Sequence, residues 1–149
     1  MVNFDYQTPT RLIFGKGVVS EKLAGVMSKF GKNVLITYGG GSIKRIAPGY
    51  EKSLYDLVKE ILADKNMFEL PGIQPNPKFN PSVLDGVRMC QEHDIDVILS
   101  VGGGSVLDCT KAIAGVAGTL EGNVMDKVEE AWDIVCGRKP TTAAVPIVD

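Results

Sequence analysis

Two segments of the chain repeat one another, and they constrain its fold more than any other feature. Each is a short apolar run that ends in Gly-Gly-Gly-Ser, one over residues 35–42 and the other over 98–105. Such runs suit strands buried on both faces, and the glycines mark the turn that ends each strand. In a parallel sheet both turns lie on the carboxyl edge, where ligands bind at the point at which strand order reverses. The repeat therefore predicts one ligand crevice lined by two glycine loops.

The rest of the chain alternates between short β-branched runs and segments of helical period, as in a parallel sheet with helices on both faces. We expect strands over 33–38, 67–70, 96–101 and 143–148. We expect helices over 23–30, 54–62, 80–90, 105–117 and 126–136, and a strand or hairpin over 3–14. The predicted fold is α/β, a Rossmann-like doubly wound parallel sheet with an N-terminal strand or hairpin.

Length and composition limit the class of protein. The 149 residues suffice for one domain, so we expect a single domain over 1–149 and no second one. A net charge of -2 with 44% hydrophobic and 23% charged residues is typical of a globular protein that binds neither nucleic acid nor membrane. No secretion signal or membrane segment is visible, so we expect a cytoplasmic protein. Because the last strand pattern stops at Asp149, we also expect a truncated piece of a longer chain.

Cysteine and histidine residues offer no metal or nucleophile chemistry. The spacing of Cys90, Cys109 and Cys136 fits neither a disulfide framework nor a CxxC motif, so we expect reduced, buried thiols. Cys109 has no histidine partner in view, which argues against a nucleophile. The one histidine, His93, stands near the end of a predicted helix and is expected at the surface. We therefore expect no catalytic residue and no metal site in this chain.

The glycine loops themselves predict an anion site. Without Cβ atoms their backbone can adopt positive φ and bring N–H groups against phosphate oxygens. A helix expected to start at Ser105 adds unpaired N–H groups, so a pyrophosphate is expected at Gly102, Gly103, Gly104 and Ser105. Neither loop is a true GxGxxG, since Leu107 and Lys44 stand where the third glycine would be. The alternative is a tight turn in which Ser105 caps the helix.

Several motifs in order make the interpretation more specific. Gly72-Ile73-Gln74-Pro75-Asn76-Pro77 is followed by Gly102-Gly103-Gly104-Ser105-Val106-Leu107-Asp108. With these motifs the chain resembles the iron-containing, group III alcohol dehydrogenase family, nearest its butanol dehydrogenase and broad aldehyde reductase branch. The likeness runs from the opening residues 8–17 to the final residues 145–149.

The resemblance implies particular roles. Gly103, Gly104 and Ser105 would hold the diphosphate of a nicotinamide dinucleotide, Asn76 would touch the adenosine ribose, and Asp108 would lie beside the diphosphate loop. The complete enzyme would be a homodimer that transfers hydride between NAD(P)H and a short-chain alcohol or aldehyde. Its iron or zinc would be held by one aspartate and three histidines of a helical C-terminal domain that this chain lacks. The chain alone is therefore expected to bind the cofactor without turnover.

The residues after the first strand bear on the choice of cofactor. Family members that prefer NAD commonly have an acidic residue where this chain has Tyr38-Gly39. An acidic side chain there would repel a 2′-phosphate, whereas Gly39, Gly40, Gly41 and Ser42 offer room and donors, with Lys44 nearby. The sequence therefore favours NADP, with NAD as the alternative, and Lys44 with Arg45 is equally well explained as a solvated pair.

Two other classes of protein stay open at this point. One is a free-standing nucleotide-binding or regulatory module without catalysis. The other is the related dehydroquinate synthase and glycerol dehydrogenase group, which shares glycine-rich loops but differs around Pro75-Asn76-Pro77.

Overall fold

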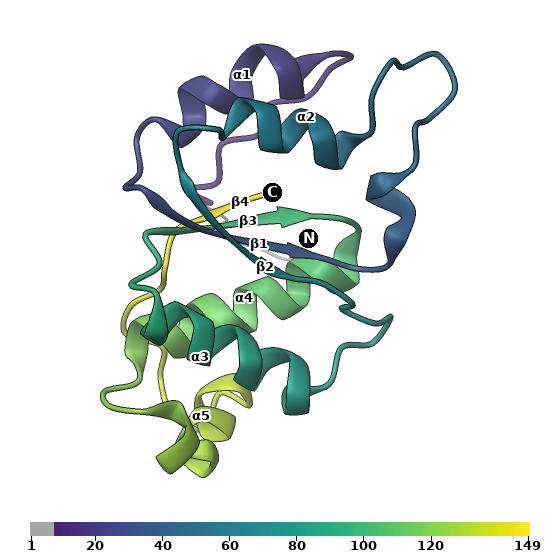
Figure 1. Cartoon of the computed structure of the whole chain (residues 1–149). Coiled ribbons are helices and arrows are strands. Elements are labelled where there is room, and N and C mark those ends of the chain that lie inside the picture. Colours follow the sequence, from purple (N-terminus) through teal and green to yellow (C-terminus); the bar gives the residue numbers. More distant parts are fainter. Residues whose placement is uncertain (1–7) are drawn as a thin grey trace, which may run out of the picture.

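A computed structural model describes residues 8–149 and has a parallel four-stranded sheet at its centre (Figure 1). Its strands are β1 (Asn33–Tyr38), β2 (Asn66–Leu70), β3 (Val97–Val101) and β4 (Ile147–Val148). They lie in the order β2-β1-β3-β4, and each neighbouring pair is parallel. β1 lies between β2 and β3. The chain therefore passes from β1 to β2 on one side and then returns across β1 to form β3 on the other side.

Helices cover both faces of this sheet, as the sequence predicts (Figure 1). One face carries α1 (Val18–Met27) and α2 (Leu54–Ile61), and the other carries α3 (Leu84–Glu92), α4 (Gly104–Thr119) and α5 (Val128–Val135). Three short helical turns complete the connections: η1 (Gly41–Lys44), η2 (Phe79–Val83) and η3 (Val124–Asp126). The α/β, Rossmann-like class is thus confirmed. None of the helices within residues 8–149 is long and apolar enough to span a bilayer.

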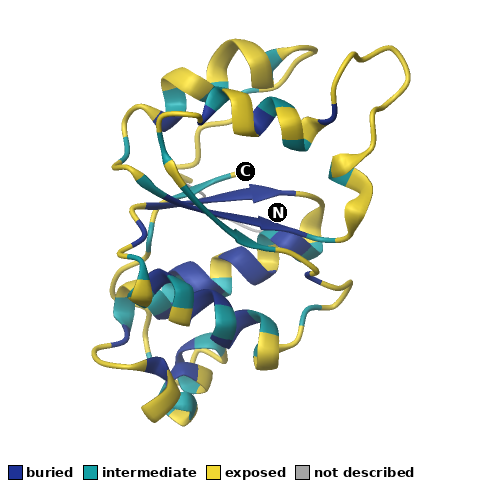
Figure 2. Ribbon diagram, in the orientation of Figure 1, coloured by how far each residue is buried: buried dark blue, intermediate teal, exposed yellow. Residues whose placement is uncertain are grey.

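Two hydrophobic clusters hold the layers together, one on each face of the sheet (Figure 2). Alternate side chains of β1 divide between them: Leu35 packs towards α3 and α4, while Val34 and Ile36 pack towards α1 and α2. The same alternation holds in β3, so both central strands are buried on both faces. Because both faces of β1 and β3 are buried, each strand needs a continuous run of apolar residues.

Element ends differ from the sequence expectations at several places. The first helix spans Val18–Met27 instead of 23–30, and the third spans Leu84–Glu92 instead of 80–90. Residues 8–14 form no strand; Leu12 and Phe14 are 84% and 94% exposed, so no packed face holds them in one. The first part of the expected strand or hairpin, residues 3–7, lies outside the described residues.

The last strand is also shorter than the expected 143–148. The Thr119 hydroxyl donates to the carbonyl of Ala143, and the Val145 amide donates to the carbonyl of Ala114. Residues 143–145 are therefore hydrogen-bonded to α4 and not to β3. Only Ile147 and Val148 pair with β3, as β4.

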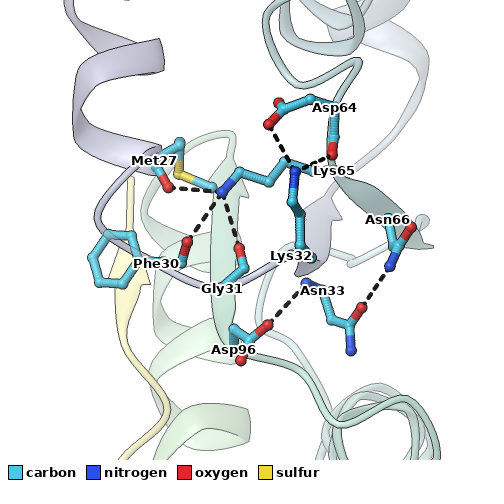
Figure 3. Close-up of polar contacts among 9 residues, drawn as sticks. All are labelled: Met27, Phe30, Gly31, Lys32, Asn33, Asp64, Lys65, Asn66 and Asp96. Atoms are coloured by element: carbon cyan, nitrogen blue, oxygen red, sulfur yellow. Dashed lines mark hydrogen bonds and ion pairs between the residues drawn. The ribbon is translucent and has the colours of Figure 1, made fainter.

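Polar contacts tie the amino ends of the strands to the end of α1 (Figure 3). The Lys65 ammonium donates to the carbonyls of Met27, Phe30 and Gly31 at 3.0–3.1 Å. The Asp96 carboxylate accepts a hydrogen bond from the backbone amide of Asn33 at 2.9 Å. A Cβ on Gly31 would lie 2.2 Å from that carboxylate. Gly31 is thus needed because Asp96 occupies the place of its side chain.

Replacing Lys65 by methionine should lower the free energy of unfolding by about 1–3 kcal/mol, because three carbonyl oxygens lose a charged donor. Urea unfolding followed by circular dichroism measures the change. Lys32→Met is the matched control: its ammonium lies 3.2 Å from the Asp64 carboxylate, but both side chains are about two-thirds exposed, so little stability should be lost. Equal losses in the two variants would contradict the role given to Lys65.

Candidate functional site

The two glycine loops lie side by side at the carboxyl edge of the sheet. In the parallel pairing of β1 with β3, Tyr38 stands opposite Val101, so Gly39 and Gly102 follow at the same level. The connection after β1 runs through α2 on one face, and the connection after β3 runs through α4 on the other. This is the strand-order reversal at which open α/β sheets bind ligands. The adjacency predicted from the repeat is confirmed.

Only one glycine in each loop is needed by the fold itself. A Cβ on Gly102 would lie 2.6 Å from Cγ2 of Val106, and a Cβ on Gly39 would lie 3.2 Å from the carbonyl oxygen of Ile73. At the remaining four positions, Gly40, Gly41, Gly103 and Gly104, a Cβ would meet nothing within 4 Å. The space in front of these four residues is therefore free for an approaching ligand.

The expectation that these loops use positive φ is wrong. None of the six loop glycines is among the residues of positive φ, and Gly103 has an extended conformation with φ -97° and ψ -173°. Positive φ therefore does not account for these glycines, and close approach of a ligand to their backbone stays a prediction. The backbone turns without any conformation that only glycine adopts.

The α4 helix starts at this edge with an uncapped end. Its N-cap is Gly103, which has no side chain to bond, and its first turn has no acidic residue. The amides of Gly104 and Ser105 have no partner within the helix, and the macrodipole places partial positive charge there. The alternative in which Ser105 caps the helix is wrong, because Ser105 already lies inside the first turn. Such a helix end favours an anion.

Buried contacts join the two loops to the same helix. The hydroxyls of Thr37 and Thr110 are 2.6 Å apart in the core, and Thr110 also bonds the carbonyl of Val106 at 2.8 Å. The Val106 side chain adjoins Gly102 and lies 3.7 Å from where a Cβ of Gly39 would be. The ends of β1 and β3 and the start of α4 therefore form one packed unit.

The loop that carries Asn76 passes beside the first glycine loop. The amide of Gly72 donates to the Gly39 carbonyl at 2.9 Å, and the amide of Ile73 donates to the Tyr38 carbonyl at 3.2 Å. Asn76 itself is exposed and has a φ of 54°, which is uncommon for a residue with a side chain. These bonds hold the loop at the same edge of the sheet.

Asp108 and Ser42 lie at the margins of this edge. Asp108 is one turn beyond Gly104 on the same face of α4, is exposed, and lies 3.9 Å from the Lys111 ammonium. Ser42 is exposed in η1 and borders a hollow of about 580 Å³ between the starts of α1 and α2. Of the ten residues expected at the site, seven lie in loops or turns at the carboxyl end of the sheet, and Gly104, Ser105 and Asp108 lie in the first two turns of α4.

The histidine and the cysteines take no part in this edge. His93 lies at the amino end of the sheet, where its ring stacks on that of Phe68 with the two ring centroids 4.0 Å apart. Burial raises the pKa of Cys90 to about 12 and of Cys109 to about 11, so both stay protonated thiols. The expectation that all three thiols are buried fails for Cys136, which is exposed. Within residues 8–149, no group of three or more His, Cys, Asp or Glu side chains is placed to hold a metal ion.

A cluster that the sequence did not reveal lies beside the first glycine loop. The hydroxyls of Tyr38 and Tyr55 each donate to one oxygen of the Glu69 carboxylate at 2.7 Å. The Lys44 ammonium lies over both rings, 4.5 Å from the Tyr55 centroid and 5.2 Å from that of Tyr38. The four residues come from β1, η1, α2 and β2, so no local pattern in the sequence could indicate the group.

The class of the fold is a Rossmann-like α/β domain, and known proteins share it. The solved aldehyde reductase YqhD of Escherichia coli matches with a TM-score of 0.77 and 37% identity, over 98% of this chain and 35% of that one. The solved NADH-dependent butanol dehydrogenase A of Thermotoga maritima matches with a TM-score of 0.77 and 32% identity, over 97% and 33% of the two chains. In sequence, the probable NADH-dependent butanol dehydrogenase 2 of Bacillus subtilis is 47% identical over 148 residues.

The model of the iron-containing alcohol dehydrogenase family matches residues 9–148. The chain therefore belongs to the iron-containing alcohol dehydrogenase family, as its motifs predict. It spans about a third of the length of the curated relatives it matches; in the Bacillus subtilis protein the match covers 98% of this chain and 34% of the relative.

Replacing Gly102 by alanine should destabilise the fold by about 1–3 kcal/mol, because the new methyl group would overlap the stiff Val106 side chain. Gly104→Ala is the control, since its methyl would enter open space and alanine favours a helix. Thermal unfolding of both variants measures the difference. In a Val106→Ala background the cost of Gly102→Ala should shrink, and an unchanged cost would refute the overlap.

Proposed function

We propose that this chain binds a nicotinamide dinucleotide at the glycine-lined edge of the sheet. The diphosphate would lie on Gly102, Gly103, Gly104 and Ser105, where the amides at the start of α4 can donate to its oxygens. The adenosine ribose would lie towards Gly39, Gly40, Gly41 and Ser42, with Asn76 and Asp108 at the sides of the groove. When bound, the cofactor supplies the hydride that the nicotinamide ring carries.

One observation supports this proposal above the others. Two adjacent loops at the strand-order reversal contain four glycines that neither the backbone conformation nor the packing of the chain requires. Beside them an uncapped 16-residue helix begins without an acidic residue in its first turn. Open backbone, unpaired amides and partial positive charge together form a surface complementary to a diphosphate.

The preference of the site for NADPH is a finer part of the proposal. The names of the relatives divide, with NADH in the butanol dehydrogenases and NADPH in the Escherichia coli aldehyde reductase, so the preference has to come from this chain's own residues. Gly39 stands at the end of β1, where an acidic side chain would repel a 2′-phosphate. With Gly40 and Gly41 open and Ser42 exposed, the loop has room for that phosphate.

For the whole protein we propose hydride transfer between NAD(P)H and a short-chain alcohol or aldehyde, in a cytoplasmic homodimer. The residues of this chain do not fit the family's metal, because His93 is stacked at the far end of the sheet and no ligand cluster occurs within 8–149. Metal binding and the substrate contacts are therefore assigned to the part of the relatives beyond this match. The chain itself supplies the cofactor-binding part.

Titration of the purified chain by calorimetry should show binding of NADPH, with NADH bound more weakly. Gly104→Ala should reduce the affinity for both about tenfold or more, equivalent to 1.4 kcal/mol, because a methyl group would stand where the diphosphate approaches. Its thermal stability should match that of the unchanged chain, which separates a lost site from a lost fold. The proposal fails if neither dinucleotide binds at millimolar concentration, and the NADPH preference fails if NADH binds more tightly.

The chain should not catalyse reduction of butyraldehyde by NADPH, even with added Fe²⁺ or Zn²⁺. Catalysis in this family depends on a bound metal, and the described residues offer no ligand set for one. The absorbance of NADPH at steady state measures the rate, and the chain's own affinity for NADPH shows that the cofactor site is filled. Sustained turnover proportional to chain concentration would show that the catalytic groups are present here after all.

A further inference from the structure

The cluster of Tyr38, Tyr55, Glu69 and Lys44 holds a cation beside the first glycine loop. Lys44 follows Ser42 by two residues within η1, and its ammonium rests on the faces of the two tyrosine rings at 4.5 and 5.2 Å. Cation–π attraction holds the ammonium at the faces of the two rings. Lys44 forms no hydrogen bond or ion pair within residues 8–149, so its donors are available to a ligand.

Hydrogen bonds to Glu69 hold the rings of Tyr38 and Tyr55 in place. Each tyrosine hydroxyl donates to a different oxygen of Glu69, and the two rings meet edge to face at 6.1 Å. Burial and the bond to Glu69 raise the pKa of Tyr38, so its hydroxyl stays protonated as a donor. Partial burial raises the pKa of Glu69, but the two hydroxyls and Lys44 outweigh it, and the carboxyl pKa lies below its ordinary value. Glu69 is therefore a charged anchor for both hydroxyls.

We propose that Lys44 contacts the 2′-phosphate of NADPH and that Tyr38, Tyr55 and Glu69 are positioning residues for it. This inference rests on the proposed binding of the dinucleotide, and it names the residue that sets the choice between NADPH and NADH. A freely rotating lysine side chain loses rotamer entropy when a ligand fixes it, and this loss weakens binding. Here the rings have already confined Lys44, so a phosphate on the Gly39–Ser42 loop meets an ordered donor.

The same cluster compensates the Glu69 carboxylate, which lies close to this loop. Glu69 lies on β2 beside Ile36 of β1, near the carboxyl end of both strands. An uncompensated carboxylate there would oppose a 2′-phosphate, as an acidic residue at the end of β1 would. With both oxygens bonded and Lys44 nearby, the carboxylate charge is balanced before the cofactor arrives.

The test compares dissociation constants of NADPH and NADH for variants of the chain. Lys44→Ala should weaken NADPH about tenfold or more, the usual loss for a charge-assisted bond, and leave NADH within about twofold. Lys59→Ala is the matched control. Its ammonium also lies over Tyr55, at 5.3 Å, and interacts with Glu69, but it stands on α2 and not on the loop. It should change neither constant.

A second pair of variants tests the positioning role. Tyr55→Leu removes the ring under Lys44 and should weaken NADPH several-fold while leaving NADH unchanged, whereas Tyr55→Phe keeps the ring and should retain most of the NADPH affinity. If Lys44→Ala weakens both cofactors equally, or neither, the inference fails while the proposed cofactor site stands. If the unchanged chain binds neither cofactor, the proposed function fails, and the inference falls with it.

Discussion

The parallel pairing of β1 with β3 is the contact on which the rest of the candidate site depends. It sets Tyr38 beside Val101, so both glycine loops begin at one level of the sheet edge. It also lets a single side chain, Val106, fill the space beside Gly39 and Gly102. A shift of one residue in this register would turn the side chains of one strand to the opposite face and separate the loops. The buried alternation of both strands opposes such a shift, so the hydrophobic core determines how the two glycine loops lie at the proposed cofactor site.

Much of the fold was predictable because its strongest elements have local signals. The apolar run 33–38 became β1 without change, and α4 starts within one residue of the expected place. Element ends were less predictable, because they depend on residues distant in sequence. The carbonyls at the end of α1 are bonded by Lys65, 38 residues beyond Met27, and the residues before β4 are held by Thr119 of α4. Neither contact has a sequence pattern.

In the candidate site, too, the parts with a local sequence signal were predictable and those formed by distant residues were not. The glycine loops could be located from the repeat, since a strand followed by Gly-Gly-Gly-Ser carries its own signal. One reason given for the glycines was wrong, because none of them uses positive φ, and the close approach of a ligand stays a prediction. The alternative in which Ser105 caps the helix was also wrong. Of the cluster around Glu69, Lys44 and Tyr38 were named from the sequence but neither Tyr55 nor Glu69 was, and their contacts were not predicted. The members of this cluster are single polar or aromatic residues on four elements, and only the sheet order brings them together.

The bond between Thr37 and Thr110 has a consequence for how the groove would respond to a ligand. Because it joins β1 to α4 inside the core, and Thr110 also bonds the Val106 carbonyl, the two walls of the groove cannot move apart without breaking a buried polar link. The groove is therefore organised in advance of binding. Association with it should resemble the docking of rigid bodies, with little of the interaction energy consumed in ordering the backbone.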